Sequence, residues 1–309
     1  MRAAVYIPHF NGVGRLRTTL DALRAQSVGV DTVVVDNGSS DDSMAMAREE
    51  FPEVERVELG RNLGFGAAIN RAVAMRPADP LILLNNDASA EPRFAEALLE
   101  RAGDGAETVA GVLVQEREPT LIDSAGVVAD RTLMGFDHLH GEPLEAALSA
   151  PDPLGPTGGA ALYRRAAFEA VGGFDERIFL YYEDLDLALR LAAAGARCRL
   201  AGEARAVHAY SASLGAASGR KYAHTGWSRG YLLRRYGVMS QPRLALRALA
   251  CEGAICAGQL LRDRTAAGIG GRLRGWREAD GLARRDRDEA PLLEISAREA
   301  LALRRRRRG

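Results

Sequence analysis

Short apolar runs alternate with longer amphipathic segments along the first 110 residues. The runs are rich in Val, Ile and Leu, as in strands that are buried on both faces of a sheet. The segments between them repeat apolar residues every three or four positions, which is typical of helices packed by one face. We predict strands at 3–8, 31–36, 54–59 and 81–84 and helices at 14–26, 43–51, 65–76 and 91–100. This alternation predicts an α/β fold with a mostly parallel central sheet flanked by helices.

From residue 109 onward the pattern is richer in strands and less regular. A Pro/Gly-rich loop at 151–159 separates two groups of elements, and a helical pattern of Leu and Ala begins near residue 183. We predict strands in the runs 109–115 and 121–130, a strand and a short helix within 160–176, and two more short strands within 195–210.

Beyond residue 213 the chain is predicted to form a helical extension. The Gly/Ser/Ala-rich stretch 211–219 predicts a mobile loop, and Leu and Ala at helical spacing predict helices at 221–237 and 242–264. We therefore divide the chain into a first domain, residues 1–213, and a C-terminal extension, residues 214–309.

Charge is balanced over the whole chain but not along it. Lys+Arg and Asp+Glu each number 41, so no overall field favours nucleic acid as a partner. Residues 241–309 hold 16 arginines and nine acids, a net charge of +7, and the chain ends in an arginine run within 303–309. Such a run is typical of a disordered, solvated tail, and the alternative is contact with anionic lipid headgroups.

The cysteines and the apolar segments indicate the compartment. Cys198, Cys251 and Cys256 show no C-x-x-C spacing, so neither a disulfide framework nor a zinc site is predicted, and a reducing compartment fits best. We find no signal-peptide pattern and no run of about 18 uninterrupted apolar residues. We therefore expect a cytoplasmic protein that is at most peripheral on the inner face of the cell membrane.

Polar clusters follow four of the predicted strands. They read "PHFNG", "DNGSSDD", "GRNLGFG" and "NND" in chain order. Each one alone is compatible with an ordinary turn, because Asn, Asp, Gly and Ser are the usual turn residues. Ligands of open α/β sheets bind beyond the carboxyl ends of the strands, so four clusters in succession predict a site for a nucleotide-sized ligand.

Two stretches contain carboxylates suited to chemistry. In "LILLNNDAS", Asp87 directly follows a buried strand, where a hard oxygen ligand can hold Mg²⁺ or Mn²⁺ against a diphosphate. In "YYEDLDLALR", Glu183, Asp184 and Asp186 crowd the start of a helix. Capping of the helix N-terminus is one explanation, and a catalytic base tuned by its neighbours is the other.

Five spaced motifs resemble one known family. In order, "VVVDNGSSDDS", "ELGRNLGFGAAIN", "LLNNDA", "GGAALYRRAAFEAVGGFDERIFLYYEDLDLALRLAAAGARC" and "AVHAYSAS" are similar to family 2 glycosyltransferases of the GT-A fold, and most similar to the rhamnosyltransferase-like group. The resemblance covers residues 3 to about 213. It implies a Rossmann-like nucleotide-binding half within the first domain and an enzyme of the hexosyltransferase class.

The resemblance also implies roles for individual residues. Asp184 matches the general base, and Glu183 matches a supporting or acceptor-positioning acid, whereas Asp186 is expected to be a cap or a surface charge. Asp87 and His208 match the metal ligands, with Asn85 at the place where many relatives have the first acid of a D-x-D motif. The residues implied in binding the nucleotide-sugar are Pro8, Asn11, Asp36, Asn37, Arg61, Asn62, Asn70, Asn86, Gly158 and Gly159.

The implied reaction is an inverting transfer of a sugar from a nucleotide-diphosphate sugar to a hydroxyl. The favoured donor is dTDP-rhamnose, and UDP- or GDP-sugars remain alternatives. The acceptor is expected to be a glycan, a lipid-linked glycan or a small molecule in cell wall or polysaccharide biosynthesis. The implied cofactor is Mg²⁺ or Mn²⁺, which would neutralise the departing diphosphate.

Two other functions compete with this interpretation. The first is a Rossmann dehydrogenase, because the stretch "GFGAAI" mimics its dinucleotide-binding motif. However, the stretch lacks the third glycine and follows the third strand rather than the first. The second is a degenerate transferase that binds sugars or partners without catalysis, which Asn85 makes conceivable. For the extension we hypothesise an acceptor-side or homodimer-forming appendage, with Trp227, Tyr231, Trp276 and its arginines facing lipid or a partner.

Overall fold

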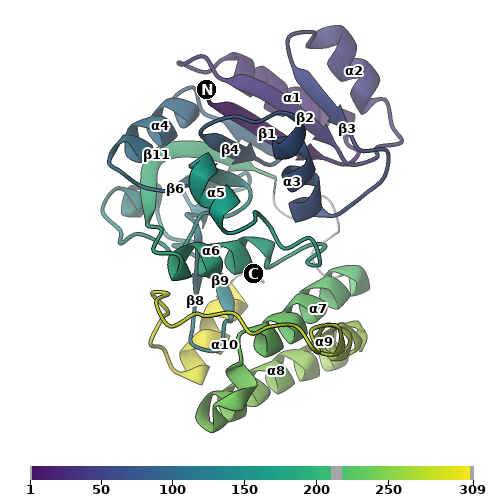
Figure 1. Ribbon diagram of the computed structural model, residues 1–309, viewed down its shortest axis with the longest axis vertical. Coiled ribbons are helices and arrows are strands. Elements are labelled where there is room, and N and C mark those ends of the chain that lie inside the picture. Colours follow the sequence, from purple (N-terminus) through teal and green to yellow (C-terminus); the bar gives the residue numbers. More distant parts are fainter. Residues whose placement is uncertain (1, 210–217, 307–309) are drawn as a thin grey trace.

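The computed structural model describes residues 2–209 and 218–306 (Figure 1). A nine-stranded sheet lies at its centre, with the strand order β3-β2-β1-β4-β10-β6-β11-β5 and with β7 paired to β6. Helices pack against it, and further helices form a separate layer at the lower edge of the view. The predicted α/β class with a flanked central sheet is confirmed.

The first four strands form the parallel part of the sheet. They are β1 (Ala4–His9), β2 (Asp31–Asp36), β3 (Glu55–Glu58) and β4 (Leu81–Leu84), and each is parallel to its neighbours within this group. All four match the predicted runs to within two residues. Their carboxyl ends lie at one edge of the sheet, which is where the polar clusters of the sequence gather.

The remaining strands make the sheet mixed. β10 (Ala160–Tyr163) is antiparallel to β4 and to β6 (Thr108–Gln115), and β11 (Cys198–His208) is parallel to β6. The short strands β5 (Ala88–Ala90) and β7 (Ile122–Ser124) are antiparallel to β11 and β6, respectively.

One strand prediction is wrong. The segment 195–210 was predicted to hold two short strands, but β11 is a single strand whose register with β6 shifts between Leu200 and Arg205. Gly202 lies inside that shift, where a Cβ would sit 2.4 Å from the carbonyl oxygen of Ala147. Glycine therefore lets the strand bulge past this neighbour without ending.

Helices cover both faces of the sheet. Side chains of α1 (Val13–Arg24), α2 (Ser43–Glu50) and α4 (Phe94–Gly103) share one hydrophobic cluster with the sheet. Those of α3 (Phe65–Met75), α5 (Arg165–Ala170) and α6 (Glu183–Ala193) share another. Within β1, Val5 and Ile7 belong to the first cluster and Ala4 and Tyr6 to the second. Burial on both faces explains the unbroken apolar runs.

The C-terminal layer consists of helices and a small hairpin. Its helices are α7 (Gly219–Arg235), η2 (Val238–Ser240), α8 (Pro242–Arg262), α9 (Ala267–Glu278) and α10 (Ala297–Arg306). They lie next to the hairpin of β8 (Val127–Ala129) and β9 (Gly135–Asp137). The short helix η1 (Leu144–Leu148) packs beside β11. Glycines let α7 and α9 approach closely, since a Cβ on Gly230 would lie 2.0 Å from the carbonyl oxygen of Arg272. Helices α7 and α8 were predicted, whereas α9 and α10 were not.

Two expectations about the extension can be compared with the structure. The tail 303–309 was expected to be disordered; residues 303–306 belong to α10, in which Ala300 is fully buried beside Cys251. Tyr231 was expected to face lipid or a partner, but it is fully buried, with Trp227 stacked on it. Residues 307–309, and residues 211–217 of the predicted mobile loop, lie outside the described residues.

Candidate active site

The loops after β1 and β2 are locked together at the edge of the sheet. The backbone N–H of Ser40 donates to Oδ1 of Asn11 at 2.9 Å, and the backbone N–H of Asn11 donates to Oγ of Ser39 at 2.9 Å. The backbone N–H of Ser39 in turn donates to Asp36 Oδ1 at 3.1 Å. Pro8 pairs with Val35 in the register of these strands. Of the predicted nucleotide-binding residues, Pro8, Asn11 and Asp36 therefore lie together.

The loop after β3 joins the same group through Asn37. The Asn37 amide donates to Asn62 Oδ1 at 3.1 Å and accepts a hydrogen bond from the backbone N–H of Leu63 at 2.7 Å. Arg61 packs its backbone on Gly38, where a Cβ would lie 2.6 Å from the Arg61 Cα. The Arg61 side chain is exposed, which leaves its guanidinium able to reach an anion.

Asp87 and His208 meet on the other side of this edge. The β5–β11 pairing places His208 opposite Ala88, so the histidine is adjacent to Asp87, the residue before β5. The distance between Asp87 Oδ1 and His208 Nε2 is 3.4 Å. Two residues predicted as metal ligands, far apart in the sequence, are thus brought together.

Asp123 holds the other nitrogen of His208, and sequence reasoning missed it. Its Oδ2 lies 2.7 Å from His208 Nδ1. Burial disfavours the imidazolium, but the hydrogen bonds to Asp123 and Asp87 outweigh it and raise the pKa of His208 to about 9. The sequence feature that could have revealed Asp123 is an acid within the apolar strand run 121–130, because a buried carboxylate requires a polar partner.

The residues present fit a small divalent cation. The described residues contain no group of three or more His, Cys, Asp or Glu side chains that could hold a metal. However, one carboxylate and one imidazole 3.4 Å apart match two neighbouring ligands of a six-coordinate ion, whose donors are about 3 Å apart at the usual bond lengths. The remaining ligands would have to come from a diphosphate and water, and the hard oxygens of carboxylate and phosphate suit Mn²⁺ and Mg²⁺.

Asn86 is bonded to His9, a second residue that sequence reasoning missed. The Asn86 amide and Nδ1 of His9 are 2.8 Å apart. His9 is only 1% exposed, and burial lowers its pKa, so the ring is neutral near pH 7. This contact links the carboxyl ends of β1 and β4 and fixes the side chain of Asn86. The sequence feature that could have revealed His9 is its position directly after the apolar run 3–8.

The glycine pair at 158–159 lies against Phe65, at the start of α3, and Asn85, directly after β4. A Cβ on Gly158 would lie 2.7 Å from Cζ of Phe65, and one on Gly159 would lie 2.8 Å from Nδ2 of Asn85. The glycines were predicted to let ligands approach the backbone. The structure gives a different reason for glycine at these positions, because a side chain here would collide with Phe65 or Asn85.

Asn70 lies apart from the loops of the edge. Its amide donates to the carbonyl oxygen of Phe174 at 2.9 Å and to Glu176 Oε1 at 3.2 Å, and its Oδ1 accepts from the N–H of Phe174 at 3.0 Å. In this conformation Asn70 ties α3 to the segment before α6, so its observed role is to position that segment.

The two acids at the start of α6 follow a constrained backbone. Tyr181 and Tyr182 both have positive φ values, +68° and +69°. Aromatic residues rarely adopt this conformation, and such strain is concentrated at functional sites. Asp184 is half-buried, and its Oδ1 accepts the N–H of Leu185 at 2.8 Å. The helix N-terminus favours its ionised form.

Glu183 occupies a different environment from Asp184. It is 7% exposed, and its Oε2 has no hydrogen-bond partner among the described residues. Burial and the nearby charge of Asp184 raise the pKa of Glu183 to about 8. The two adjacent acids therefore lie in different environments, and folding favours the protonated form of Glu183.

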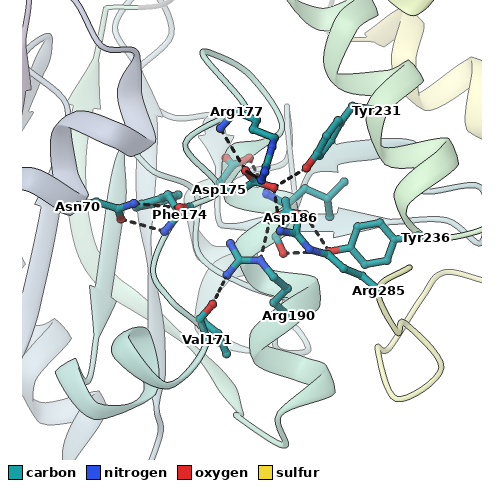
Figure 2. Close-up of polar contacts among 12 residues, drawn as sticks. Asn70, Val171, Phe174, Asp175, Arg177, Asp186, Arg190, Tyr231, Tyr236 and Arg285 are labelled. Carbon is teal, nitrogen blue, oxygen red and sulfur yellow. Dashed lines mark hydrogen bonds and ion pairs between the residues drawn. The ribbon is translucent and has the colours of Figure 1, made fainter. Parts of the chain in front are cut away.

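The expectation that Asp186 is a cap or surface charge is wrong. It is fully buried, and its carboxylate binds Arg190 at 2.8 Å, Tyr236 at 2.9 Å and Arg285 (Figure 2). Arg285 also binds Asp175 at 2.8 Å, and Tyr231 donates to the same carboxylate. Asp186 points to a different side of α6 from Asp184, because a separation of two residues turns a helical side chain by about 200°.

Comparisons with known proteins agree on one family. The profile described as "Glycosyl transferase family 2" matches residues 4–172, and "Glycosyl transferase family group 2" matches residues 126–265. The chain is 32% identical over 190 residues to the N-acetylglucosaminyl-diphospho-decaprenol L-rhamnosyltransferase of Mycobacterium tuberculosis (strain CDC 1551 / Oshkosh), covering 54% of this chain and 62% of that relative. It is 30% identical over 226 residues to the O-antigen biosynthesis protein RfbC of Myxococcus xanthus, covering 69% of this chain and 18% of that relative. The chain therefore spans less than two thirds of these curated relatives.

Solved structures support the fold. The mannosyltransferase PcManGT from Pyrobaculum calidifontis, in complex with GDP-Man and Mn²⁺, has a TM-score of 0.53 at 18% identity, covering 90% of this chain and 86% of that one. GalNAc-T7 with UDP, GalNAc and Mn²⁺ has a TM-score of 0.62 at 13% identity, covering 92% of this chain and 55% of that one. The family profile matches more than half of the chain and agrees with the predicted family, so the chain belongs to glycosyltransferase family 2.

Proposed function

We propose that this glycosyltransferase is an inverting enzyme that moves a sugar from a nucleotide-diphosphate sugar to an acceptor hydroxyl. The observation that carries this proposal is the pair of unlike acids at the start of α6, with Asp184 half-buried at a helix N-terminus and Glu183 buried beside it. dTDP-rhamnose is the favoured donor, because the Mycobacterium tuberculosis relative is named an L-rhamnosyltransferase.

Asp184 is the proposed general base. As the acceptor hydroxyl attacks the anomeric carbon, its proton passes to the carboxylate of Asp184, the new glycosidic bond forms and the bond to the diphosphate breaks. A single displacement of this kind inverts the anomeric centre. Protonated Glu183 would support Asp184 by avoiding a second negative charge beside it and by donating a hydrogen bond to the acceptor.

The donor is proposed to lie across the carboxyl edge of the sheet. Asp36 and Asn37 would contact the base and ribose, with Pro8 and Asn11 bordering them and Arg61 and Asn62 lining the nucleotide. Asn86 would contact the sugar-phosphate part, close to Gly158 and Gly159. The interlocked loops described above hold these groups in place before the donor binds, which lowers the entropy cost of binding.

Asp87 and His208 are the residues proposed to hold Mg²⁺ or Mn²⁺. Once bound, the cation would neutralise charge on the departing diphosphate. Asp123 keeps the His208 ring oriented, so that Nε2 faces Asp87. Asn85 contributes no charge, so only one carboxylate of this cluster would face the donor's phosphates.

The acceptor is proposed to be a lipid-linked glycan. The support comes from the same relative, whose name specifies a diphospho-decaprenol acceptor. An acceptor of this kind would place the enzyme on the cytoplasmic face of the cell membrane. A role in cell wall or polysaccharide biosynthesis agrees with the family's curated members.

The test compares wild type with Asp184→Asn in a panel of nucleotide-sugars with Mn²⁺. We expect thermal stabilisation by one donor in both proteins, because Asn keeps the shape of the side chain. Transfer and donor hydrolysis should fall about 10²–10⁴-fold in the variant, the usual contribution of a general base. Equal turnover of the two proteins would contradict the assignment of Asp184.

A further inference from the structure

The outward face of α8 is apolar and exposed. Leu246 is 72% exposed, Leu249 60%, Leu260 46% and Leu261 81%. Between them, the exposed positions are small: Ala250, Gly253, Ala254 and Ala257. These residues recur every three or four positions and therefore form one continuous stripe along the helix. In Figure 1, α8 lies at the lower edge of the molecule, on the far side of the extension from the sheet.

The charged residues of α8 avoid this face. Glu252 is buried and binds Arg229 and Arg272, each at 2.6 Å. Arg247 binds the buried Asp130 at 2.6 Å. The other two charges, Arg243 and Arg262, stand in the first and last turns of the helix. The exposed stripe between them therefore contains no charged residue.

Helix α8 is packed on the surface of the protein and is not a membrane-spanning helix in this arrangement. Among the described residues it is the one helix long and apolar enough to cross a membrane. Glu252, however, sits at its middle and forms ion pairs with α7 and α9. Crossing a bilayer would break these pairs and place an unpaired carboxylate in hydrocarbon, which is strongly unfavourable. The buried side of the helix is fixed and only its outward side is available for a contact.

We propose that this face docks into the interfacial region of a membrane that contains anionic phospholipid. Five exposed arginines of α8, α9 and their connection make no ion pair within the described residues: Arg243, Arg262, Arg264, Arg274 and Arg277. Anionic headgroups would neutralise these positive charges while the leucines enter the acyl boundary. A second copy of the chain would instead bring like charges together, so the charge favours lipid over self-association.

This inference goes beyond the proposed function and does not require it. The arginine run at the end of the chain was the membrane contact expected from sequence. Of the aromatic residues expected to face lipid, Tyr231 is fully buried, and Trp227 and Trp276 are half-buried against the same hydrophobic cluster. The exposed leucines of α8 are therefore the apolar part of the contact, and the arginines are its electrostatic part.

The experiment measures co-sedimentation of the full chain with vesicles. Vesicles of phosphatidylcholine with 30% phosphatidylglycerol are compared with phosphatidylcholine alone. We expect binding to the anionic vesicles, and a drop of about tenfold or more in Leu246→Gln/Leu261→Gln, because two exposed leucines lose their contact with the acyl boundary. The matched control is Leu148→Gln, a leucine that is 57% exposed on η1, outside this face, and it should bind like wild type.

Several results would overturn the proposal. The first is a wild-type protein that does not bind the anionic vesicles. The second is an equal loss of vesicle binding in the double variant and in the Leu148→Gln control. The third is a double variant that binds the vesicles like wild type. Sedimentation velocity provides a further test, since a wild-type dimer that becomes monomeric in the double variant would assign the face to a second copy. Donor hydrolysis without acceptor is measured in parallel and should be equal in all variants, which separates this proposal from the enzymatic one.

Discussion

The carboxylate of Asp123 lies 2.7 Å from Nδ1 of His208, while Nε2 of the same ring faces Asp87 at 3.4 Å. Asp123 and His208 are 85 residues apart in the chain and meet because β7 and β11 both pair with β6. A carboxylate behind a histidine fixes its ring orientation and tautomer and makes its free nitrogen a better ligand. Asp123 is therefore a positioning residue for the proposed metal site.

Replacing Asp123 should weaken metal binding. We expect Asp123→Ala to reduce Mn²⁺ affinity by about 10–100-fold, the usual effect of removing such a partner, and Asp123→Asn to cost less because its amide oxygen still accepts a hydrogen bond. Electron paramagnetic resonance of free Mn²⁺ measures the affinity. Asp104→Ala, at an exposed carboxylate paired with Arg101, is the control. Wild-type affinity in Asp123→Ala would contradict this role.

Metal affinity should rise with pH. His208 has a folded-state pKa of about 9, so below that pH its ring carries a proton that the metal must displace from Nε2. We expect Mn²⁺ affinity to increase by up to about tenfold per pH unit between pH 6.5 and 8.5. Calorimetry in buffers of different ionisation enthalpy should show close to one proton released. A flat affinity over this range would exclude His208 as a ligand.

The pH dependence of stability should report on Glu183. Its pKa in the folded protein is raised from 4.5 to about 8, so folding favours the protonated form. The associated stability is fully present below pH 4.5 and is lost as pH rises through about 8. Glu183→Gln removes this loss. We therefore expect the Tm of the variant minus that of wild type to be higher at pH 9 than at pH 6. An equal Tm difference at the two pH values would contradict the raised pKa of Glu183.

Arg285 should contribute more to stability than an exposed arginine. Arg285→Met would remove one partner from each of two buried carboxylates, Asp175 and Asp186, and should cost on the order of 3 kcal/mol. Arg17→Met breaks an exposed pair with Glu50 and should cost about 1 kcal/mol or less. Urea unfolding of both variants measures the difference. Similar costs would show that the network of Figure 2 is not a major source of stability.

The same network bears on the division of the chain. Arg285, Tyr231 and Tyr236 come from the extension, and they bind two carboxylates of the first domain, one of them on α6. Side chains of α6 and of α7 also share one hydrophobic cluster. The boundary near residue 213 stays a prediction, and these contacts imply that the first domain would lose the partners of buried charges without the extension.

Local patterns in the sequence determined most of the elements and part of the site. Apolar runs marked β1, β2 and β4 because a strand buried on both faces has few polar positions, and polar residues marked the strand ends. Asp87 and His208 were paired from motifs, and their side chains lie close together, while their role as metal ligands stays a prediction. Asp186 was misjudged because two of its three partners lie 50 and 99 residues farther along the chain, and a local pattern carries no information about such partners.

The sequence by itself therefore determined the α/β class, the parallel half of the sheet and the family. Only the tertiary structure decided which polar groups meet. The antiparallel pairing of β5 with β11 brings His208 to Asp87, and the return of the C-terminal segment brings Arg285 to α6. The physical reason is that periodicity reports which side of an element is buried, whereas contacts between distant residues depend on the path of the whole chain.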